Sequence, residues 1–355
     1  MKSYLVGGWV RDHFLRGVAG SDRDWVVVGA THNEMIANGF KKVGASFPVY
    51  IHPKSKEEYA LARQERKTAP GYHGFSVYSD ETVSLEEDLL RRDLTINALA
   101  FDPESKELID PFHGQDDWNA NILRHISDAF ADDPLRLIRL ARFAALFPHM
   151  TIAHETIELC RKIVASGELL ALPAERISKE IRKMYQTAQC PGRFWIVLEQ
   201  LGALSVILPE YAAVNVPERL SLAVFNYEKP FLKGVYEFSN AGATWQSVKI
   251  KLCLTRAEES ILKSLDQLKV LKHLDANSIW QCLHATRALH DHTSLAIAWQ
   301  IADLSQTSWA LIEECINLLK THPTPLSELE LIAPHQRSQY IHEHSIKVLK
   351  NHGIN

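Results

Sequence analysis

Residues 2–28 decide the fold, and they read KSYLVGGWVRDHFLRGVAGSDRDWVVV. Lys2–Val6 is a short, mainly apolar run that breaks at two glycines, and Trp9–Arg16 has the character of a helix that ends near Gly17. A second apolar run, Asp24–Val28, is typical of a strand. This alternation of short strands and helices predicts an α+β domain.

Further short segments extend this domain over residues 1–126. We expect strands at Val49–His52, Tyr59–Arg63 and Leu108–Asp110. We expect a helix at Leu85–Ala98. The polar stretch Gln64–Ser79 contains Gly71 and Gly74, and we interpret it as a mobile loop with two hinge positions. These features predict a head made of a mixed sheet with helices.

After Phe130 the pattern changes to apolar residues at helical spacing. The segments with this spacing are Asp133–Phe147, His154–Ser166, Pro173–Gln186, Gly192–Leu201, Ala257–Lys272, Thr293–Leu304 and Trp309–Leu319. We therefore predict an α+β head over residues 1–126, followed by an all-α neck over 127–210 and an all-α body and tail over 211–355.

Composition limits the setting and the partners of the chain. The 355 residues carry a formal net charge of −4, so a polyanionic partner requires a locally basic surface. The five cysteines form no CxxC pair, which favours reduced thiols in the cytoplasm. No segment approaches the roughly 20 apolar residues of a membrane-spanning helix, and the N-terminus lacks the pattern of a signal peptide. We expect a soluble, cytoplasmic protein.

Asp22 and Asp24 are separated by one residue where the strand Asp24–Val28 begins. Because side chains alternate along a strand, both carboxylates are expected on the same face. Adjacent carboxylates repel each other unless a cation lies between them, and Mg²⁺ prefers such oxygen ligands. By itself, however, such a pair is more often a solvated turn before a strand.

Gly7 and Gly8 give the carboxylate pair its context. They lie between a strand and a helix, where glycines let backbone N–H groups approach a phosphate and where the helix N-terminus adds positive potential. Arg11, on the first helical turn, is placed to bind a triphosphate through two N–H groups. Together these residues predict a nucleoside-triphosphate site beside a Mg²⁺ site.

The same stretch resembles the first motif of class II tRNA nucleotidyltransferases, the CCA-adding enzymes of the polymerase-β-like nucleotidyltransferase superfamily. The family's other motifs follow in order: Arg91-Arg-Asp-Leu-Thr-Ile-Asn-Ala98, Asp110-Pro-Phe-His-Gly114, Asp132-Asp-Pro-Leu-Arg136 continuing to Arg139 and Arg142, and Pro173-Ala-Glu-Arg-Ile177 with Glu180. The family usually has Glu where Asp132 stands, which is a conservative departure. The resemblance covers residues 1 to about 210 and fades beyond them.

This resemblance implies template-independent addition of CCA to the 3′ end of tRNA from CTP and ATP, with Mg²⁺ held by the catalytic Asp22 and Asp24. Asp133 and Arg136, three apart on a predicted helix, would read the incoming base, because together they present acceptors and donors. The other implied nucleotide-binding residues are Gly8, Arg11, Arg92, Arg139 and Arg142. Residues 211–355 would grip the acceptor arm and elbow of tRNA, and no membrane or protein partner is implied.

Three rival functions stay open at this point. They are an enzyme that adds only A, a poly(A) polymerase, and a non-catalytic RNA-binding protein on the same scaffold. Poly(A) polymerases carry an Arg-rich strand where this chain has Val43–Val49, which favours the tRNA enzyme. Glu58 is either a third carboxylate or the partner in an ion pair.

His290-Asp291-His292 contains the His-Asp dipeptide of a phosphohydrolase domain found in some bacterial relatives. The rest of that domain's signature is missing, since Ser247–Ala257 contains neither His nor Asp. We therefore expect the second half to be catalytically silent.

Overall fold

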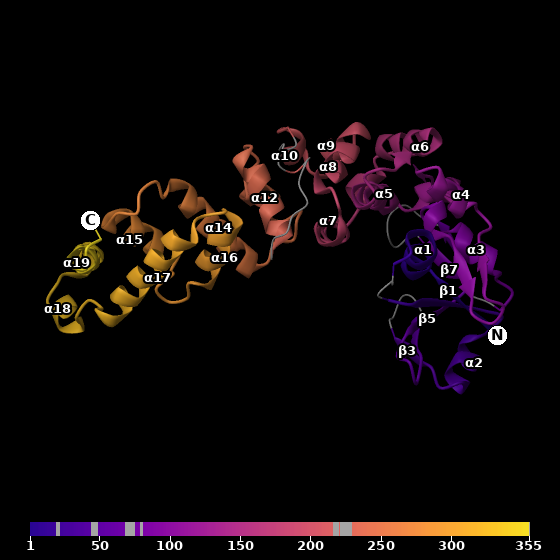
Figure 1. Ribbon diagram of the computed structural model, residues 1–355, viewed down its shortest axis with the longest axis horizontal. Coiled ribbons are helices and arrows are strands. Elements are labelled where there is room, and N and C mark those ends of the chain that lie inside the picture. The colour runs from indigo at the N-terminus through magenta and orange to yellow at the C-terminus, as the bar shows by residue number, and fades with distance from the viewer. Residues whose placement is uncertain are drawn as a thin grey trace. The chain divides into compact units, whose positions relative to one another are not determined.

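The computed structural model describes residues 1–18, 22–43, 49–67, 75–78, 81–215, 220 and 229–354. The chain divides into two compact units, Met1–Val224 and Phe225–Asn355 (Figure 1). The first unit begins with a mixed sheet flanked by helices and continues with further helices, and the described part of the second unit is helical. The predicted fold class is therefore confirmed. The finer division at residues 126 and 210 stays a prediction.

A seven-stranded sheet forms the N-terminal part of the first unit, in the order β3-β4-β5-β2-β1-β8-β9. Its strands are β1 (Lys2–Val6), β2 (Asp24–Val28), β3 (Lys41–Val43), β4 (Val49–Ile51), β5 (Glu58–Leu61), β8 (Ala100–Asp102) and β9 (Glu107–Ile109). Strand β2 runs antiparallel to β1 and parallel to β5. The predicted strands at both ends of residues 2–28 are thus neighbours in the middle of the sheet.

Helix α1 (Gly8–Arg16) follows β1 directly, as the sequence predicts. Gly7 precedes it at a φ of 74°, and Gly17 ends it in the left-handed conformation, a role that glycine fills without a Cβ clash. Val10 of the helix is fully buried against Leu5 and Leu99. This packing places the first turn of α1 over the end of β1.

The predicted helix Leu85–Ala98 is wrong in its second half. Helix α3 (Leu85–Leu90) ends before Arg91, and only a 3₁₀ turn, η1 (Thr95–Asn97), follows. The carboxylate of Asp93 accepts hydrogen bonds from the backbone N–H of Leu94 and from Nδ2 of Asn97, at 2.9 Å each. Such local side-chain bonds compete with the helix ladder. The chain therefore turns after α3 instead of continuing as a helix.

The interpretation of Gln64–Ser79 as a mobile loop is wrong where the structure describes it. Strands β6 (Gln64–Lys67) and β7 (Phe75–Tyr78) pair in antiparallel register as a separate two-stranded sheet. The proposed hinges Gly71 and Gly74 lie outside the described residues.

Four more helices of the first unit lie close to their predicted bounds, and two short ones after them were not predicted. They are α5 (Leu135–Leu146), α6 (His154–Ala165), α7 (Ala174–Thr187) and α8 (Pro191–Gln200), followed by the short α9 (Leu204–Ile207) and α10 (Pro209–Ala212). Helix α5 contacts both α7 and α8 and is buried along almost its whole length. The sequence did not predict α2 (His32–Ala37), α4 (Gly114–Asn119), β3 or β8, because such short elements show little periodicity.

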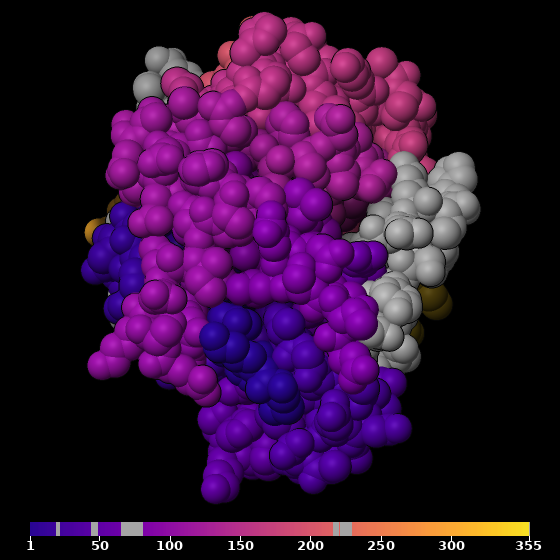
Figure 2. Space-filling view, turned by 90° about the vertical axis from the view of Figure 1, so that its right-hand side faces the viewer, coloured from indigo at the N-terminus to yellow at the C-terminus, as the bar shows by residue number. Residues whose placement is uncertain are grey.

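Two short strands join the head to these helices. Strands β10 (Ile122–Leu123) and β11 (Thr151–Ile152) pair in parallel, so the chain before α5 is bonded to the chain before α6. In Figure 2 the segments of the sheet and of these helices form one continuous surface on the side of the molecule that faces the viewer.

Gly114 begins α4 where that helix packs on η1, and Asp110 accepts its backbone N–H at 2.7 Å. A Cβ on this residue would lie 2.4 Å from the carbonyl oxygen of Thr95, a backbone atom that no rotamer change can move. We expect Gly114→Ala to lower the free energy of unfolding by about 3 kcal/mol. Denaturant unfolding of the purified variant measures this loss.

Gly17→Ala is the matched control, because nothing lies within 4 Å of the added Cβ and only the left-handed backbone is strained. It should cost about 1 kcal/mol. Equal losses in the two variants would contradict the close packing at Gly114.

The second unit contains α12 (Pro230–Asn240), α13 (Trp245–Val248), α14 (Arg256–Val270), α15 (Ala276–Ala285), α16 (Thr293–Ile301), α17 (Gln306–Thr321), α18 (Leu326–Glu330) and α19 (Arg337–Asn351). The buried ammonium of Lys233 donates to Asp303 and to the carbonyl of Ile301, both at 2.8 Å, which ties α12 to the end of α16. Asp291 accepts from the backbone N–H and hydroxyl of Thr293, the first residue of α16. Over the described residues of both units, no helix has the length and apolarity needed to cross a bilayer.

Candidate functional site

A cavity of about 900 Å³ opens in the first unit between the sheet and helices α5 and α7. Every site residue predicted from the sequence lines it: Gly8, Arg11, Asp22, Asp24, Arg92, Asp133, Arg136, Arg139 and Arg142. The other charged and polar lining residues are Asp12, Arg16, Arg63, Arg91, Asp93, Asn97, Arg176, Lys183 and Thr187. Far more cations than carboxylates face this space, which suits a polyanionic ligand on a chain of net negative charge.

The pairing of β1 with β2 brings the glycines to the carboxylates. Val6, the last residue of β1, is the register partner of Asp24, the first residue of β2. Gly7 therefore lies beside the aspartates, and a Cβ on it would be 3.5 Å from the Asp24 carboxylate and 3.6 Å from Nη1 of Arg92. The N-terminus of α1 thus meets the acidic pair, as the spacing in the sequence predicts.

Asp22 and Asp24 supply two carboxylates to the cavity wall. The pKa of Asp24 is raised by burial and by repulsion from Glu58 and Asp22, and Arg92 opposes this shift. Glu58 is the register partner of Asp24 on β5, but it does not line the cavity. Among the described residues, no three or more His, Cys, Asp or Glu side chains are grouped to hold a metal ion.

This donor set fits a hard divalent cation. Such an ion would relieve the repulsion around Asp24, and Mg²⁺ commonly takes one or two carboxylates and completes its shell with water and substrate phosphates. Two carboxylates with mutual repulsion are therefore sufficient protein ligands.

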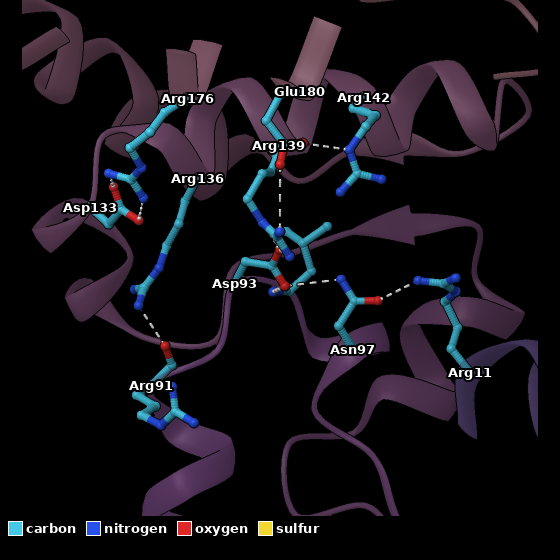
Figure 3. A network of polar contacts seen from close by, with 11 residues as sticks. Arg11, Arg91, Asp93, Asn97, Asp133, Arg136, Arg139, Arg142, Arg176 and Glu180 are labelled. Carbon is cyan, nitrogen blue, oxygen red and sulfur yellow. Dashed lines mark hydrogen bonds and ion pairs between the residues drawn. The ribbon is translucent and has the colours of Figure 1, made fainter. Parts of the chain in front are cut away.

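A chain of hydrogen bonds connects α1 to α5 across the cavity floor (Figure 3). Nη1 of Arg11 donates to the Asn97 side chain at 2.8 Å, and Asn97 donates in turn to Asp93. Two guanidinium nitrogens of Arg139 donate to the other oxygen of Asp93, at 2.8 and 2.7 Å. Burial raises the pKa of Asp93, but Arg139 and Asn97 outweigh it and hold that pKa well below its usual range.

Glu180 on α7 connects this chain to Arg142. Its carboxylate accepts from Nε of Arg142 at 2.6 Å and lies 3.8 Å from Nη1 of Arg139. Lys183, one turn later on α7, also lines the cavity, and its pKa is lowered by burial and by the neighbouring Arg142. Helix α7 therefore both positions arginines of α5 and adds a cation of its own.

Asp88, at the end of α3, holds the arginine pair of the second motif. It is fully buried and accepts from Nε and Nη2 of Arg91 and from Nη2 of Arg92. Burial raises the pKa of Asp88, but Arg91 and Arg92 keep it below its usual value. The predicted nucleotide contact Arg92 is thus oriented by a carboxylate that the sequence analysis did not single out.

The expectation that Asp133 and Arg136 share one face of a helix is wrong in detail. Asp133 is extended, and α5 begins only after Pro134, because that proline provides the first helical conformation. The Asp133 carboxylate accepts hydrogen bonds from Nη1 and Nη2 of Arg176, at 3.2 and 2.9 Å (Figure 3). Arg136 donates instead to the carbonyls of Ala129 and Arg91, at 2.5 and 2.6 Å.

Sequence reasoning missed Asp88, Lys183 and Thr187 entirely, and it named Arg176 only as part of the motif Pro173–Ile177. Lys183 and Thr187 follow Arg176 and Glu180 at helical spacing along α7. That periodicity is the signal from which they were predictable. Asp88 lies outside the motifs and had no such signal.

Comparison with known proteins identifies the family. A family model described as "Poly A polymerase head domain" matches residues 3–124, and one described as "Probable RNA and SrmB- binding site of polymerase A" matches residues 149–214. A CCA-adding enzyme of Francisella tularensis subsp. novicida is 40% identical over the whole of this chain and 92% of its own length. The chain belongs to the family of CCA-adding enzymes. Membership in this nucleotidyltransferase family implies dependence on a divalent metal ion.

Other CCA-adding enzymes show where the likeness is strongest. One from Marinobacter nauticus is 56% identical over 212 residues, which are 59% of this chain and 56% of that protein. The chain thus spans about half the length of this relative. A solved structure of a CCA-adding enzyme, apo form II, shares the fold with a TM-score of 0.66 at 22% identity, over 97% of this chain and 87% of that one.

Proposed function

We propose that this chain adds the 3′-terminal CCA to tRNA without a nucleic-acid template, using CTP and ATP and releasing pyrophosphate. The observation that carries the proposal is the single cavity that brings Asp22, Asp24, the N-terminus of α1 and the Asp133–Arg176 pair together. The first two features suit nucleotidyl transfer, and the third suits recognition of a base by protein groups. The five cysteines, all of which the structure describes, form no disulfide, which agrees with a cytoplasmic setting.

In the proposed reaction the tRNA 3′-hydroxyl attacks the α-phosphate of the bound nucleotide, a phosphodiester forms and pyrophosphate leaves. Asp22 and Asp24 would hold Mg²⁺, which when bound lowers the pKa of the attacking hydroxyl and offsets charge on the leaving group. Arg11, Arg92 and the N–H groups near Gly8 would bind the triphosphate and hold the α-phosphorus in line with the hydroxyl.

Base selection is assigned to the opposite wall of the cavity. The Asp133 carboxylate has lone pairs beyond those used by Arg176, so it can accept from the amino group of cytosine or adenine. Arg136 presents further N–H groups to ring acceptors of the same base. Uracil has no amino group to donate to Asp133. Its ring N–H would face the N–H groups of Arg136, where cytosine presents an acceptor.

One assay tests the function. The purified protein is incubated with Mg²⁺ and tRNA transcripts that lack CCA, end in CC or are complete, with CTP, ATP or both. Addition of two C and then one A, and nothing to the complete transcript, is the expected result. Long A tracts would overturn the proposal in favour of a poly(A) polymerase, and A added only after CC would restrict it to an A-adding enzyme.

Replacing Arg176 by methionine is expected to reduce the preference for CTP over UTP by about tenfold. Methionine keeps much of the apolar stem but removes the two charged hydrogen bonds that orient Asp133, which are worth about 1.5–3 kcal/mol each. The ratio of kcat/KM for the two nucleotides, on a transcript lacking CCA, measures the change.

Arg182→Met is the control on the same helix, since Arg182 donates to Ser178 and does not line the cavity. Its CTP preference should equal that of the wild type. An unchanged preference in both Arg176→Met and Asp133→Ala would rule out base reading by this pair.

A further inference from the structure

Trp9 and Arg23 lie against each other at the border of the cavity. The guanidinium carbon of Arg23 is 5.2 Å from the centroid of the Trp9 ring, within the range of a cation–π contact. Trp9 lines the cavity together with Asp22 and Asp24, whereas Arg23 does not. The pair therefore extends the cavity wall outward from the carboxylates.

Neighbouring groups hold both side chains in place. Trp9 stacks on His13, one turn later in α1, with ring centroids 4.7 Å apart and planes 9° apart, and it packs against the apolar cluster of Leu5, Val10 and Leu99. Nη1 of Arg23 lies 3.7 Å from the Glu57 carboxylate. These contacts bring planar groups together beside the acidic pair before any ligand arrives.

Stability alone is a weak reason for this arrangement. The Arg23 side chain is 51% exposed, and a surface ion pair as long as the one with Glu57 contributes little. Arg23 does not line the cavity, although Asp22 and Asp24 on either side of it do, and its guanidinium lies instead over the Trp9 ring. It is thus badly placed for the triphosphate but well placed for a group that lies beside the carboxylates.

We propose that Trp9 and Arg23 form a stacking surface for the terminal base of the RNA strand that supplies the 3′-hydroxyl. This inference rests on the proposed function. The attacking hydroxyl must reach Asp22 and Asp24, so the base of the same nucleotide lies no farther from them than the length of one nucleoside. Aromatic rings and guanidinium planes bind bases by stacking with little regard to sequence. That tolerance suits a strand whose terminal base changes with each addition.

The test uses a tRNA minihelix that lacks CCA and ends in 2-aminopurine, a base whose fluorescence falls when it stacks. Binding of the wild type should quench the probe. Trp9→Ala and Arg23→Gln should lose most of the quenching and weaken binding of the minihelix by about 5- to 150-fold, the range for one stacked base. Trp9→Phe keeps an aromatic face, and it should restore part of both signals.

The kinetic constants separate stacking from damage to the rest of the cavity. Arg23→Gln should raise KM for the minihelix while KM for CTP stays within twofold of the wild type. Arg161→Gln is the matched control, because Arg161 is 56% exposed and pairs with Glu158 on α6, outside the cavity. It should leave quenching and both KM values unchanged.

If Trp9→Ala, Trp9→Phe and Arg23→Gln all quench the probe as strongly as the wild type does, the stacking surface is overturned. A wild type that extends the minihelix with CCA but never quenches the probe would also overturn it, and in that case the proposed function stands. A wild type that extends no transcript refutes the proposed function, and this inference with it.

Discussion

Replacing Asp24 by asparagine is expected to lower the rate of nucleotide addition by at least about 10³-fold. The amide keeps the size of the side chain but removes the charge that would hold Mg²⁺ beside Asp22. Binding of CTP should survive, because Arg11, Arg92 and the N-terminus of α1 do not depend on that charge. Single-turnover addition to a transcript lacking CCA and CTP binding by calorimetry measure the two effects.

Asp116→Asn is the control for this variant, since Asp116 is 80% exposed in its side chain and lies outside the cavity. It should keep wild-type rates. Retention of full turnover by Asp24→Asn would refute the metal assignment. The raised pKa of Asp24 adds a check by pH, because a carboxylate must lose its proton to bind a metal ion. The concentration of Mg²⁺ needed for half-maximal rate should therefore rise as the pH falls.

Replacing Asp93 by asparagine is expected to lower the free energy of unfolding by about 3 kcal/mol. Asp93 is 5% exposed and lies 2.7 Å from Nη2 of Arg139, whereas the Glu180 carboxylate lies 3.8 Å from Nη1, so loss of the Asp93 charge removes the nearer of these two partners of the guanidinium. The amide oxygen of asparagine can still accept from the backbone N–H of Leu94, so the turn after α3 is kept and the variant isolates the loss of charge. Chemical denaturation at neutral pH measures the loss.

The pH dependence of stability provides a second measurement on Asp93. Its pKa is lower in the folded protein than in the unfolded chain, so its contribution is fully present above the unfolded value and is lost as pH falls toward the folded one. The difference between wild type and Asp93→Asn should therefore shrink in acid, below about pH 4. A difference that stays constant with pH would contradict an ionised Asp93.

Glu158→Gln is the matched control for the buried pair. It breaks an ion pair with Arg161 in which both side chains are about half exposed, at 56% and 46%. Such a pair contributes at most about 1 kcal/mol. If the two variants lost equal stability, burial would not be the source of the Asp93 effect.

Several elements of this protein could be predicted from the sequence, because their signals are local, but α12, α15 and the long α19 were not predicted. Lys2–Val6, Asp24–Val28 and the helices around α5–α8 follow from the spacing of apolar residues and from Gly7 and Gly17 at the ends of α1. The order of the seven strands could not be predicted in this way. The parallel pairing of β2 with β5, for example, joins two segments whose sequences do not indicate that they are neighbours.

The candidate site divides along the same line. Asp22, Asp24, Gly8 and Arg11 lie within a short stretch, so their order alone predicted a triphosphate site beside an acidic pair. The sequence also supplied the family's motifs, and with them the predicted site residues, but not Asp88, Lys183 or Thr187. The sequence did not predict the hydrogen-bonding partners of these residues.

Only the tertiary structure decided those partners. Asp133 meets Arg176 rather than Arg136, Arg139 meets Asp93, and Arg92 depends on the buried Asp88. The physical reason is that a buried charge must find an opposite charge or a hydrogen-bonding partner, and α5 and α7 bring candidates from distant parts of the chain. The sequence by itself thus determined which groups are candidates for the chemistry, and the packing of α5 and α7 beside the sheet determined how they are held.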